Sequence, residues 1–547
     1  MLRHRQSFPI CAHVLVAGLL ASCATLDDTE PASTATDQAV GDRTDAASDT
    51  TAFALTEEGI VRGVATAATR AFRGIPYAAA PVGALRWRPP QRAARHSTVL
   101  DATQFASHCP QPAGPFGRAS ASEDCLFLNV FTPGHVDHDA TFGLRPVMVW
   151  IHGGALTTGE SDDYDATRLV EQGDVLVVTI NYRLGALGFL AHPALTAESP
   201  DHASGNYGLM DQQAALGWVR RNIVLFGGDP SRVTIFGESA GGLSVHSQLA
   251  SPVAHGLFQR AIVESGAYQL TQPSLAAGEA AGTAFATRAG CTDPSAACLR
   301  ALSVAQVLAS QAGGFSPTPV VDGKILPRSI GAAFAAGQFN RVPVMEGSNH
   351  DEWRLFVALN DLVSGPVTVD GYPAAIQATL GIPAAAVALF TAAYPVASFP
   401  SPDLALAALG TDGIFACNAR VADQLLSRFV PTFAYEFNDE NAPQPFLPPV
   451  AFPYAAAHAS EIQYLFTLPV TVPNPGLDPD QQQLSAAMIS YWTTFARTGQ
   501  PRAPAAPPWT RFEADHDTLQ SLVPPTPAPE TGFAADHRCA FWDALRQ

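Results

Sequence analysis

A serine flanked by two glycines is the first feature of this sequence that could carry out chemistry. Residues 237–241 read GESAG, which fits G-x-S-x-G, with Ser239 between the apolar run 232–236 and the helical pattern 241–250. A serine at a sharp turn between strand and helix projects its hydroxyl above the sheet, and the helix N-terminus favours negative charge beside it. The other interpretations are a glycine-rich turn without chemistry and a dinucleotide-binding loop. The latter is disfavoured because its fingerprint is G-x-G-x-x-G.

A nucleophilic serine needs backbone donors for the oxyanion, a histidine base and a carboxylate that orients the histidine. The tetrapeptide HGGA at 152–155 follows the apolar run 146–151 and matches a loop whose N–H groups face such a nucleophile. Carboxylates at 351 and 352 follow the run 342–348, and His458 lies downstream of the run 432–437. The order Ser, acid, His suits this chemistry. These residues alone do not choose between Asp351 and Glu352, and His458 is one of 15 histidines.

The elements that must position these groups follow an α/β pattern. Runs rich in β-branched residues predict strands that are buried on both faces of a central, largely parallel sheet. Between them, residues 209–223 and 485–498 show the 3–4-residue apolar spacing of helices. The pattern predicts a sheet covered by helices, and the predicted strands are 146–151, 174–180, 232–236, 260–265, 342–348 and 432–437.

The composition excludes several classes of protein. The chain has 547 residues, of which 47% are hydrophobic, so it is not mainly disordered and can bury a large core. Its formal net charge of −18 argues against nucleic acid as a partner, because phosphate binding needs clustered Lys and Arg. The 43 glycines and 45 prolines show no collagen period and indicate a loop-rich globular fold.

The N-terminus has the features of an export signal. Arg3 and Arg5 precede an apolar stretch at 8–20, which is too short to span a bilayer. The sequence Leu-Ala-Ser-Cys that ends at Cys23 resembles the lipobox of bacterial lipoproteins, in which the cysteine is acylated. We therefore predict a signal peptide at 1–22 and a lipidated Cys23 with a disordered acidic tether at 23–52. The alternative is an ordinary secreted protein with an incidental cysteine.

Cysteine usage agrees with export. Six of the eight cysteines lie beyond the signal segment, and an even number in an exported protein predicts disulfides. Six cysteines allow 15 pairings, among which the spacing does not choose. Zinc is disfavoured because the sequence contains no CxxC. A loop with His135, Asp137, His138 and Asp139 matches no standard zinc pattern and is interpreted as solvated.

At this point a resemblance becomes clear. FRGIPYAAAPVGALRWRPP, SEDCLFLNV, NYRLGALGFL, GLMDQQAALGWVRRNIVLFGGDP and VTIFGESAGG resemble, in order, the signature blocks of the type-B carboxylesterases, which include the cholinesterases. The resemblance runs from about residue 56 to the end of the chain. It implies one large catalytic domain at 53–547 with the α/β-hydrolase fold, and hydrolysis of carboxylic esters without a cofactor or metal. The implied partner is a small-molecule ester, with no obligate protein partner and with membrane contact only through the lipid on Cys23, in the periplasm or at the cell surface.

The resemblance also assigns roles to individual residues. It implies Ser239 as nucleophile, His458 as base and Glu352, rather than Asp351, as acid. The implied oxyanion donors are the N–H groups of Gly154, Ala155 and Ala240. The implied disulfides are Cys109–Cys125, Cys291–Cys298 and Cys417–Cys539, and the implied structural ion pairs are Arg86–Glu123 and Arg183–Asp211. Glu238 is expected to line the site and Ser265 to be either a supporting hydrogen bonder or a plain strand-end serine.

Three departures from the family pattern bear on specificity. Ala155 replaces the third glycine of the HGGG loop, and its methyl group narrows the space beside the expected oxyanion position. Trp353 replaces the glycine after the acid, which predicts a large ring beside the triad. The loop between Cys109 and Cys125 lacks the tryptophan that binds choline in cholinesterases, which argues against quaternary-ammonium substrates. The alternative functions are cleavage of amides, lactones or thioesters by the same triad, and a non-catalytic adhesion module like the neuroligins.

Overall fold

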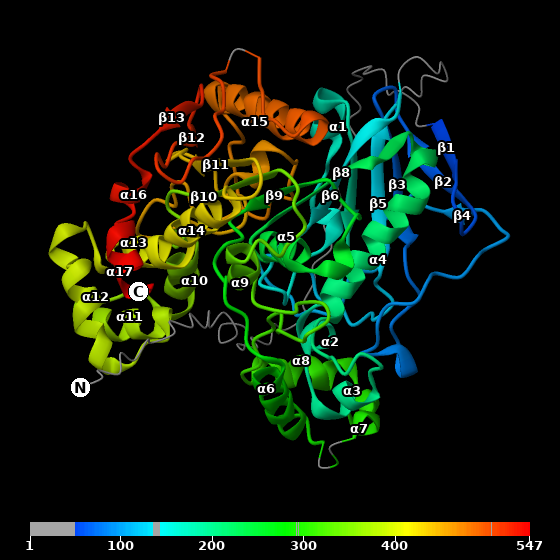
Figure 1. Cartoon of the computed structure of the whole chain (residues 1–547), viewed down its shortest axis with the longest axis horizontal. Helices are drawn as coiled ribbons and strands as arrows, with labels where there is room; N and C mark the ends of the chain where they lie inside the picture. Colours follow the sequence, from blue (N-terminus) through cyan, green and yellow to red (C-terminus); the bar gives the residue numbers. More distant parts are fainter. Residues whose placement is uncertain (1–49, 135–142, 292, 294, 505, 547) are drawn as a thin grey trace, which may run out of the picture.

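One twisted sheet crosses the whole molecule. The computed structural model describes residues 50–134, 143–291, 293, 295–504 and 506–546. Within these residues, thirteen strands form a sheet of order β1-β2-β3-β5-β7-β6-β8-β9-β10-β11-β12-β13, with β4 paired to β2 (Figure 1). The strands are β1 Thr50–Leu55, β2 Ile60–Ala65, β3 Thr69–Pro76, β4 Leu100–Asp101, β5 Phe127–Pro133, β6 Arg145–Ile151, β7 Leu176–Ile180, β8 Gly228–Glu238, β9 Arg260–Glu264, β10 Val344–Asn349, β11 Thr432–Phe437, β12 Leu519–Leu522 and β13 Ala528–Glu530.

The centre of the sheet is parallel and its two ends are antiparallel. All neighbours from β7 through β6, β8, β9, β10 and β11 to β12 pair in parallel. The hairpin-like strands β1–β3 and β5 close one end, and β13 closes the other. The six strands predicted from apolar runs are β6 to β11, so the prediction of a largely parallel α/β sheet is confirmed. The chemistry-bearing residues follow the carboxyl ends of β6, β8 and β10.

Helices cover both faces because side chains alternate along each strand. In β6, Val147, Val149 and Ile151 join the core under α4 and α5, whereas Met148 and Trp150 join the core under α1 and α15. The helices are α1 Thr167–Gly173, α2 Gly185–Phe189, α3 Pro193–Glu198, α4 Tyr207–Asn222, α5 Ala240–Ala250, α6 Leu275–Arg288, α7 Ala296–Ala301, α8 Val304–Ala312, α9 Ile330–Ala335, α10 Arg354–Ser364, α11 Tyr372–Leu380, α12 Val387–Ala393, α13 Pro402–Gly410, α14 Cys417–Leu426, α15 Pro479–Thr498, α16 Phe533–Asp536 and α17 Cys539–Arg546.

Two groups of short helices are added beyond the sheet. Figure 1 shows α6 to α8 gathered with α2 and α3 at one corner, and α10 to α13 gathered with the C-terminal α16 and α17 at another. In the described part of the chain no single helix is long and apolar enough to cross a membrane. Tyr372–Leu380 and Ala384–Ser398 meet that test only together, with a bend of 117° between them.

The folded region begins slightly earlier than predicted. β1 starts at Thr50, so residues 50–52, which the composition had placed in the tether, form strand. Ala52 and Ala54 are buried on one face of β1 while their neighbours are exposed, and the strand pairs with β2. Thr and Ala are abundant in the tether as well, so composition alone does not mark this boundary. Residues 1–49, with the predicted signal peptide and Cys23, lie outside the described residues.

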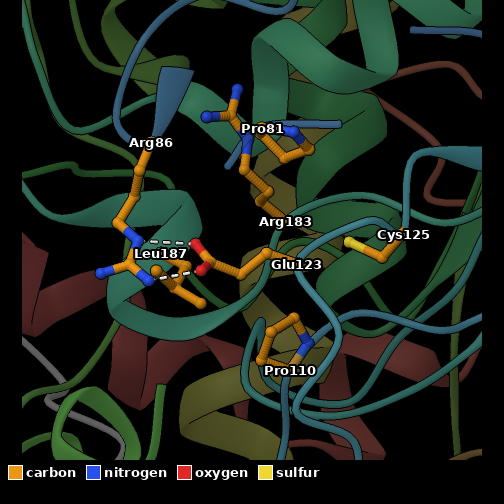
Figure 2. Close-up of a pocket in the computed structure, with 7 residues that line it drawn as sticks. All are labelled: Pro81, Arg86, Pro110, Glu123, Cys125, Arg183 and Leu187. Atoms are coloured by element: carbon orange, nitrogen blue, oxygen red, sulfur yellow. Dashed lines mark hydrogen bonds and ion pairs between the residues drawn. The ribbon is translucent and has the colours of Figure 1, made fainter. Parts of the chain in front are cut away.

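Covalent and ionic links tie the loops to this frame. Cys109–Cys125, Cys291–Cys298 and Cys417–Cys539 are bonded, which confirms the pairing that the resemblance implied. Arg86 donates two hydrogen bonds to the carboxylate of Glu123, and the one from Nε to Oε2 is 2.6 Å long (Figure 2). The second predicted pair, Arg183–Asp211, is bidentate at 2.7 Å and buried. The first pair and the first disulfide close the loop that precedes β5.

The three disulfides are expected to differ in their contribution to stability. Loop-closure entropy predicts about 4.9 kcal/mol for Cys417–Cys539, which encloses a separation of 122 residues, and about 2.5 kcal/mol for Cys291–Cys298, with a separation of 7. The double variant Cys417→Ala/Cys539→Ala should therefore lose more free energy of unfolding in urea than Cys291→Ala/Cys298→Ala. Equal losses, or a larger loss for the short loop, would contradict this ranking.

Candidate active site

Ser239 stands at a strained turn between β8 and α5. Its backbone dihedrals are φ 54° and ψ −119°, a conformation that costs energy for any residue with a side chain. The turn is held on both sides, because the Ser239 N–H donates to the carbonyl of Glu264 at 2.9 Å and its carbonyl accepts from Leu243 N–H at 2.8 Å. The predicted turn between strand and helix is therefore present, and Ser239 lines the large cavity described below.

The glycines of the motif allow close approach of backbone. A Cβ on Gly241 would lie 1.9 Å from the carbonyl oxygen of Ile151, and a Cβ on Gly237 would lie 2.5 Å from the same atom. Real Cβ atoms do not come this close, so both positions require glycine. The consequence is that α5 packs directly on the end of β6, and this contact brings the loop after β6 next to Ser239.

The loop after β6 presents free backbone donors. Gly154, Ala155 and Leu156 all have positive φ values of 95°, 55° and 59°. Among the described residues, the N–H groups of Gly154, Ala155 and Ala240 have no hydrogen-bond acceptor. A Cβ on Gly153 would lie 3.2 Å from Cβ of Ser239, so this loop touches the serine itself. Three unpartnered N–H groups beside a serine are the arrangement that an oxyanion needs.

His152 anchors this loop rather than entering the cavity. Its ring stacks on Tyr182 with centroids 4.5 Å apart, and its Nδ1 lies 2.9 Å from the carbonyl oxygen of Gly153. Burial lowers the pKa of His152 to about 4, although the nearby Gly153 carbonyl opposes the shift. A neutral, stacked histidine supports the loop without adding charge to the site.

Glu352 and His458 form the buried ion pair that the sequence predicted. Oε2 of Glu352 lies 2.5 Å from Nδ1 of His458, and neither side chain is more than 5% exposed. The other oxygen of Glu352 accepts from the backbone N–H of Asn349 at 2.9 Å. Asp351 points elsewhere and pairs with Arg354 at 2.8 Å. Geometry therefore selects Glu352 as the partner of His458, a choice that the residue pattern alone left open.

Two further carboxylates surround the histidine. Oε1 of Glu238 lies 3.1 Å from Nε2 of His458, so the predicted lining role of Glu238 extends to direct contact. Glu461, which sequence reasoning did not single out, is fully buried and accepts from the Asn349 amide at 2.5 Å. The feature of the sequence that could have identified Glu461 is its position three residues after His458, in the pattern H-x-x-E. Burial lowers the pKa of His458, but the charges of Glu238 and Glu352 outweigh it and raise the pKa to about 9.

This electrostatic environment predicts a displaced pH profile. A histidine base acts when neutral, and an ordinary histidine would lose activity below about pH 6–7. Because anions raise the pKa of His458, the acid limb of kcat/KM should lie above that range. Burial raises the pKa of Glu238 itself to about 8, so its negative charge acts on His458 in the upper part of the pH range. Glu238→Gln removes this carboxylate without changing shape, lowers the pKa of His458 and should move the limb about 1–3 pH units downward. The measurement is the pH dependence of kcat/KM.

The matched control is Glu513→Gln. Glu513 is 73% exposed and pairs only with the surface residue His516, so its loss should leave the profile in place. An acid limb that does not move in Glu238→Gln, or that moves equally in the control, would show that the contact with Glu238 does not set the pKa of His458.

Aromatic rings enclose His458, but Trp353 is not one of them. The rings of Phe356 and Phe415 lie 5.1 and 4.9 Å from the imidazole. Trp353 lies behind Phe356, with ring centroids 4.4 Å apart, and fits there because Gly410 has no side chain. The expectation of a tryptophan beside the triad was therefore wrong in detail: the ring packs in the second layer and does not line the cavity.

Ser239 and His458 line one large, mostly apolar cavity of about 1080 Å³. Its volume lies just above the range of about 300–1,000 Å³ that is typical of small-molecule sites. The loop between Cys109 and Cys125, which has no tryptophan, contributes Phe116, and this ring packs edge-on against Phe446 at 5.6 Å. The charged residues in the lining are Asp163, Glu238, His458 and Arg546. The cavity is suited to bulky apolar groups.

Two smaller expectations can be placed as well. Ser265, at the end of β9, is buried and has a φ of 50°, and its hydroxyl makes no hydrogen bond within the described residues. It is thus a strand-end serine without a visible supporting role. The loop with His135, Asp137, His138 and Asp139 lies outside the described residues.

Comparison with known proteins agrees with this geometry. The sequence model of the carboxylesterase family matches residues 50–542. The chain belongs to the carboxylesterase family. It is therefore a serine hydrolase of ester bonds with the α/β-hydrolase fold, and the boundary at residue 50 coincides with the start of β1.

Three relatives show how far the similarity extends. A mouse acylcarnitine hydrolase is 34% identical over 84% of this chain and 84% of its own length. A para-nitrobenzyl esterase of Bacillus subtilis is 36% identical over 86% of this chain and 94% of its own length. A fumonisin B1 esterase of Sphingopyxis macrogoltabida is 35% identical over 84% of both chains. The similarity thus covers nearly the whole carboxylesterase domain.

Proposed function

We propose that this carboxylesterase acts through Ser239, His458 and Glu352. Ser239 Oγ attacks the ester carbonyl while Nε2 of His458 takes its proton, and His458 then protonates the departing alkoxide. Glu352 holds Nδ1–H of His458, which keeps Nε2 as the accepting nitrogen. The N–H groups of Gly154, Ala155 and Ala240 stabilise the tetrahedral oxyanion. A water molecule then attacks the acyl-enzyme in the same way, with His458 as the base, and releases the carboxylic acid product and free Ser239.

The observation that carries this proposal is the convergence of three independent chain segments on one point. The strained turn after β8 supplies the serine, the loop after β6 supplies N–H groups without acceptors, and His458 reaches the residue adjacent to Ser239 at 3.1 Å while holding Glu352 at 2.5 Å. A structural role does not explain the first two features, because a strained backbone and backbone donors without acceptors both destabilise a fold.

The size and character of the cavity support bulky, mainly apolar esters as substrates. The names of the three relatives point to acylcarnitine, a para-nitrobenzyl ester and fumonisin B1 as their respective substrates. Such different compounds share the ester bond rather than a recognised group. We infer that this protein likewise selects the bond and the volume of its substituents.

A substrate panel tests this function. We expect hydrolysis of p-nitrophenyl esters with acyl chains of two to sixteen carbons, and much slower cleavage of the matching p-nitroanilides. Preference for the anilides, or for lactones or thioesters at equal concentration, would assign one of the alternative hydrolase activities. No turnover of any substrate by folded protein would favour the adhesion-module alternative.

We also propose that the protein is exported and held on a membrane by a lipid on Cys23. The support is the sequence of residues 1–23, with its basic start, short apolar stretch and Leu-Ala-Ser-Cys ending. More than one buried acyl chain gives stable anchoring, whereas a single chain binds only marginally. The acidic segment between Cys23 and β1 would then hold the domain away from an anionic bilayer.

Removal of the proposed anchor should change location without changing catalysis. Cys23→Ala is expected to shift the protein from the membrane fraction to the soluble fraction, while kcat and KM of the purified domain stay at the wild-type values. Cys23 precedes β1 by 27 residues in the sequence, and the triad residues all follow β1. Fractionation and sequencing of the mature N-terminus measure this. A mature N-terminus elsewhere, or wild type found wholly in the soluble fraction, would favour a secreted esterase.

A further inference from the structure

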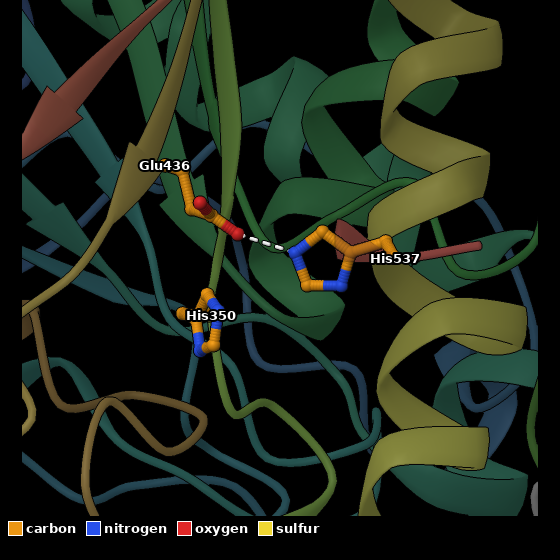
Figure 3. Close-up of side chains that lie close together, drawn as sticks. All are labelled: His350, Glu436 and His537. Carbon is orange, nitrogen blue, oxygen red and sulfur yellow. Dashed lines mark hydrogen bonds and ion pairs between the residues drawn. The ribbon is translucent and has the colours of Figure 1, made fainter. Parts of the chain in front are cut away.

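Two histidines and a glutamate meet far from Ser239 in sequence and outside the proposed mechanism. His350 follows β10, Glu436 is in β11, and His537 lies between α16 and α17 near the end of the chain. One potential ligand atom from each lies within 4.8 Å of those of the other two (Figure 3). Glu436 and His537 are buried, whereas the side chain of His350 is 39% exposed and opens the cluster to solvent.

The cluster has more negative charge than positive charge. Asp412 lies against Nδ1 of His537 at 2.8 Å, and Asn438 donates to both Glu436 and Glu530, which places these two carboxylates side by side. Within the described residues, no Lys or Arg pairs with Asp412, Glu436 or Glu530. Buried carboxylates usually have a cation as a partner. Among the described residues, the charge-bearing partner of Asp412 and Glu436 is the ring of His537.

A second cluster of similar composition shows the contrast. His108, Glu160 and Asp162 also bring three potential ligand atoms together. There, however, the guanidinium of Arg118 already pairs with both carboxylates, with Nε 2.6 Å from Glu160 Oε1. That cluster holds a permanent cation, whereas the cation among the described residues at His537 is the ring of His537 itself, whose charge depends on a proton that a metal ion can replace. The difference points to an external cation at the cluster of His350, Glu436 and His537, and not at the cluster of His108, Glu160 and Asp162.

The surroundings of His537 are those of a metal ligand. A metal-binding histidine commonly donates its other N–H to a carboxylate, which fixes the ring and its tautomer. Nδ1 of His537 faces Asp412 in this way, and Asp412 is in turn held by the hydroxyl of Tyr394 at 2.7 Å. Nε2 is then directed at Glu436, and the amide of Asn438 supports Glu436 at 3.0 Å.

We propose that His350, Glu436 and His537 bind a divalent transition metal of the Zn²⁺ class, with Glu530 beside them as a further oxygen donor. Imidazole and carboxylate ligands suit this class of ion. Bonds of about 2.0–2.1 Å in tetrahedral geometry place ligand atoms about 3.3 Å apart. To reach this spacing when the ion binds, the distance between Oε1 of Glu436 and Nε2 of His537 would increase from 2.5 Å, and the ring of His350 would move toward both atoms. The metal replaces the proton shared by Glu436 and Nε2 of His537.

The proposed ion would have a structural role. It would join the C-terminal segment, which holds His537, to the carboxyl ends of β10 and β11. His350, the ligand that follows β10, is two residues before Glu352 in the chain. The disulfide Cys417–Cys539 links the same C-terminal segment to α14. The two links would together fix the wall of the cavity that Trp542 and Phe415 line. This inference concerns metal binding alone and does not depend on the proposed catalytic roles.

Titration with Co²⁺ tests the site directly. Protein freed of metal by a chelator is titrated with CoCl₂, and the expected result is one Co²⁺ per chain with the visible absorption of a tetrahedral site, displaced by ZnSO₄. His350→Ala removes the ligand nearest to solvent and should weaken binding at least about tenfold. His516→Ala removes an exposed histidine elsewhere and should bind as tightly as wild type.

Thermal unfolding provides a second measurement. Zn²⁺ should raise the Tm of wild type and of His516→Ala, but not that of His350→Ala, because a ligand stabilises only the state that binds it. Glu436→Gln should behave as His350→Ala does, and if it does not fold, His350→Ala alone decides. Absence of stoichiometric Co²⁺ binding by wild type, or unchanged affinity in His350→Ala, would overturn the proposal.

Discussion

Replacement of Ser239 by alanine is expected to lower kcat by about six orders of magnitude and leave the fold intact. Members of a catalytic triad act as a unit, so loss of the nucleophile or of the base removes nearly the same part of the rate. His458→Ala should therefore show a similar loss, and the double variant should lose little more. Stopped assays with a p-nitrophenyl ester measure kcat, and circular dichroism verifies folding.

Ser265→Ala is the matched control for this substitution. Both serines lie at the ends of neighbouring strands and have positive φ values. Ser265, however, is buried, its hydroxyl makes no hydrogen bond within the described residues, and it does not line the cavity. Its kcat should stay near wild type. Near-normal turnover in folded Ser239→Ala would refute the assignment of the nucleophile.

Replacement of Glu352 by glutamine is expected to lower kcat by about four orders of magnitude. The amide keeps the shape of the carboxylate but favours the wrong tautomer of His458 and no longer stabilises the imidazolium. Removal of this buried anion, 2.5 Å from Nδ1, also lowers the pKa of His458, so the acid limb of the residual activity should move to lower pH. The measurements are kcat and its pH dependence.

Asp351→Asn is the control, because it changes the adjacent residue in the same way. Asp351 pairs with Arg354 and lies 3.4 Å from Nδ1 of His350 rather than beside His458. Burial raises its pKa, but the neighbouring His350 and Arg354 outweigh burial and hold the pKa below its usual value. Its loss should reduce stability modestly and change kcat by less than about tenfold. If kcat fell by orders of magnitude in Asp351→Asn but stayed near wild type in Glu352→Gln, the triad carboxylate would be Asp351 instead of Glu352.

Much of the fold could be predicted because the parallel strands are buried on both faces. Continuous β-branched runs are rare outside such strands, and the six predicted runs became β6 to β11. The edge strands were harder to predict. In β1 only Ala52 and Ala54 alternate as buried residues, and the composition of the strand is like that of the segment before it. Ser239 and the oxyanion loop could be predicted because each immediately follows a recognisable strand. His458 lies well beyond the end of β11 at Phe437, and only the family resemblance pointed to it.

The sequence by itself determined which elements form and where the reactive serine stands, because strand runs, glycines and the G-x-S-x-G turn are local features. Only the tertiary structure decided which side chains meet. It selected Glu352 over Asp351 by direct contact with His458, added Glu238 and Glu461 to the charge around that base, and moved Trp353 behind Phe356. It also brought His350 and Glu436, at the ends of β10 and β11, together with His537 from between α16 and α17. Such contacts arise from strand order and packing, which no spacing along the chain encodes.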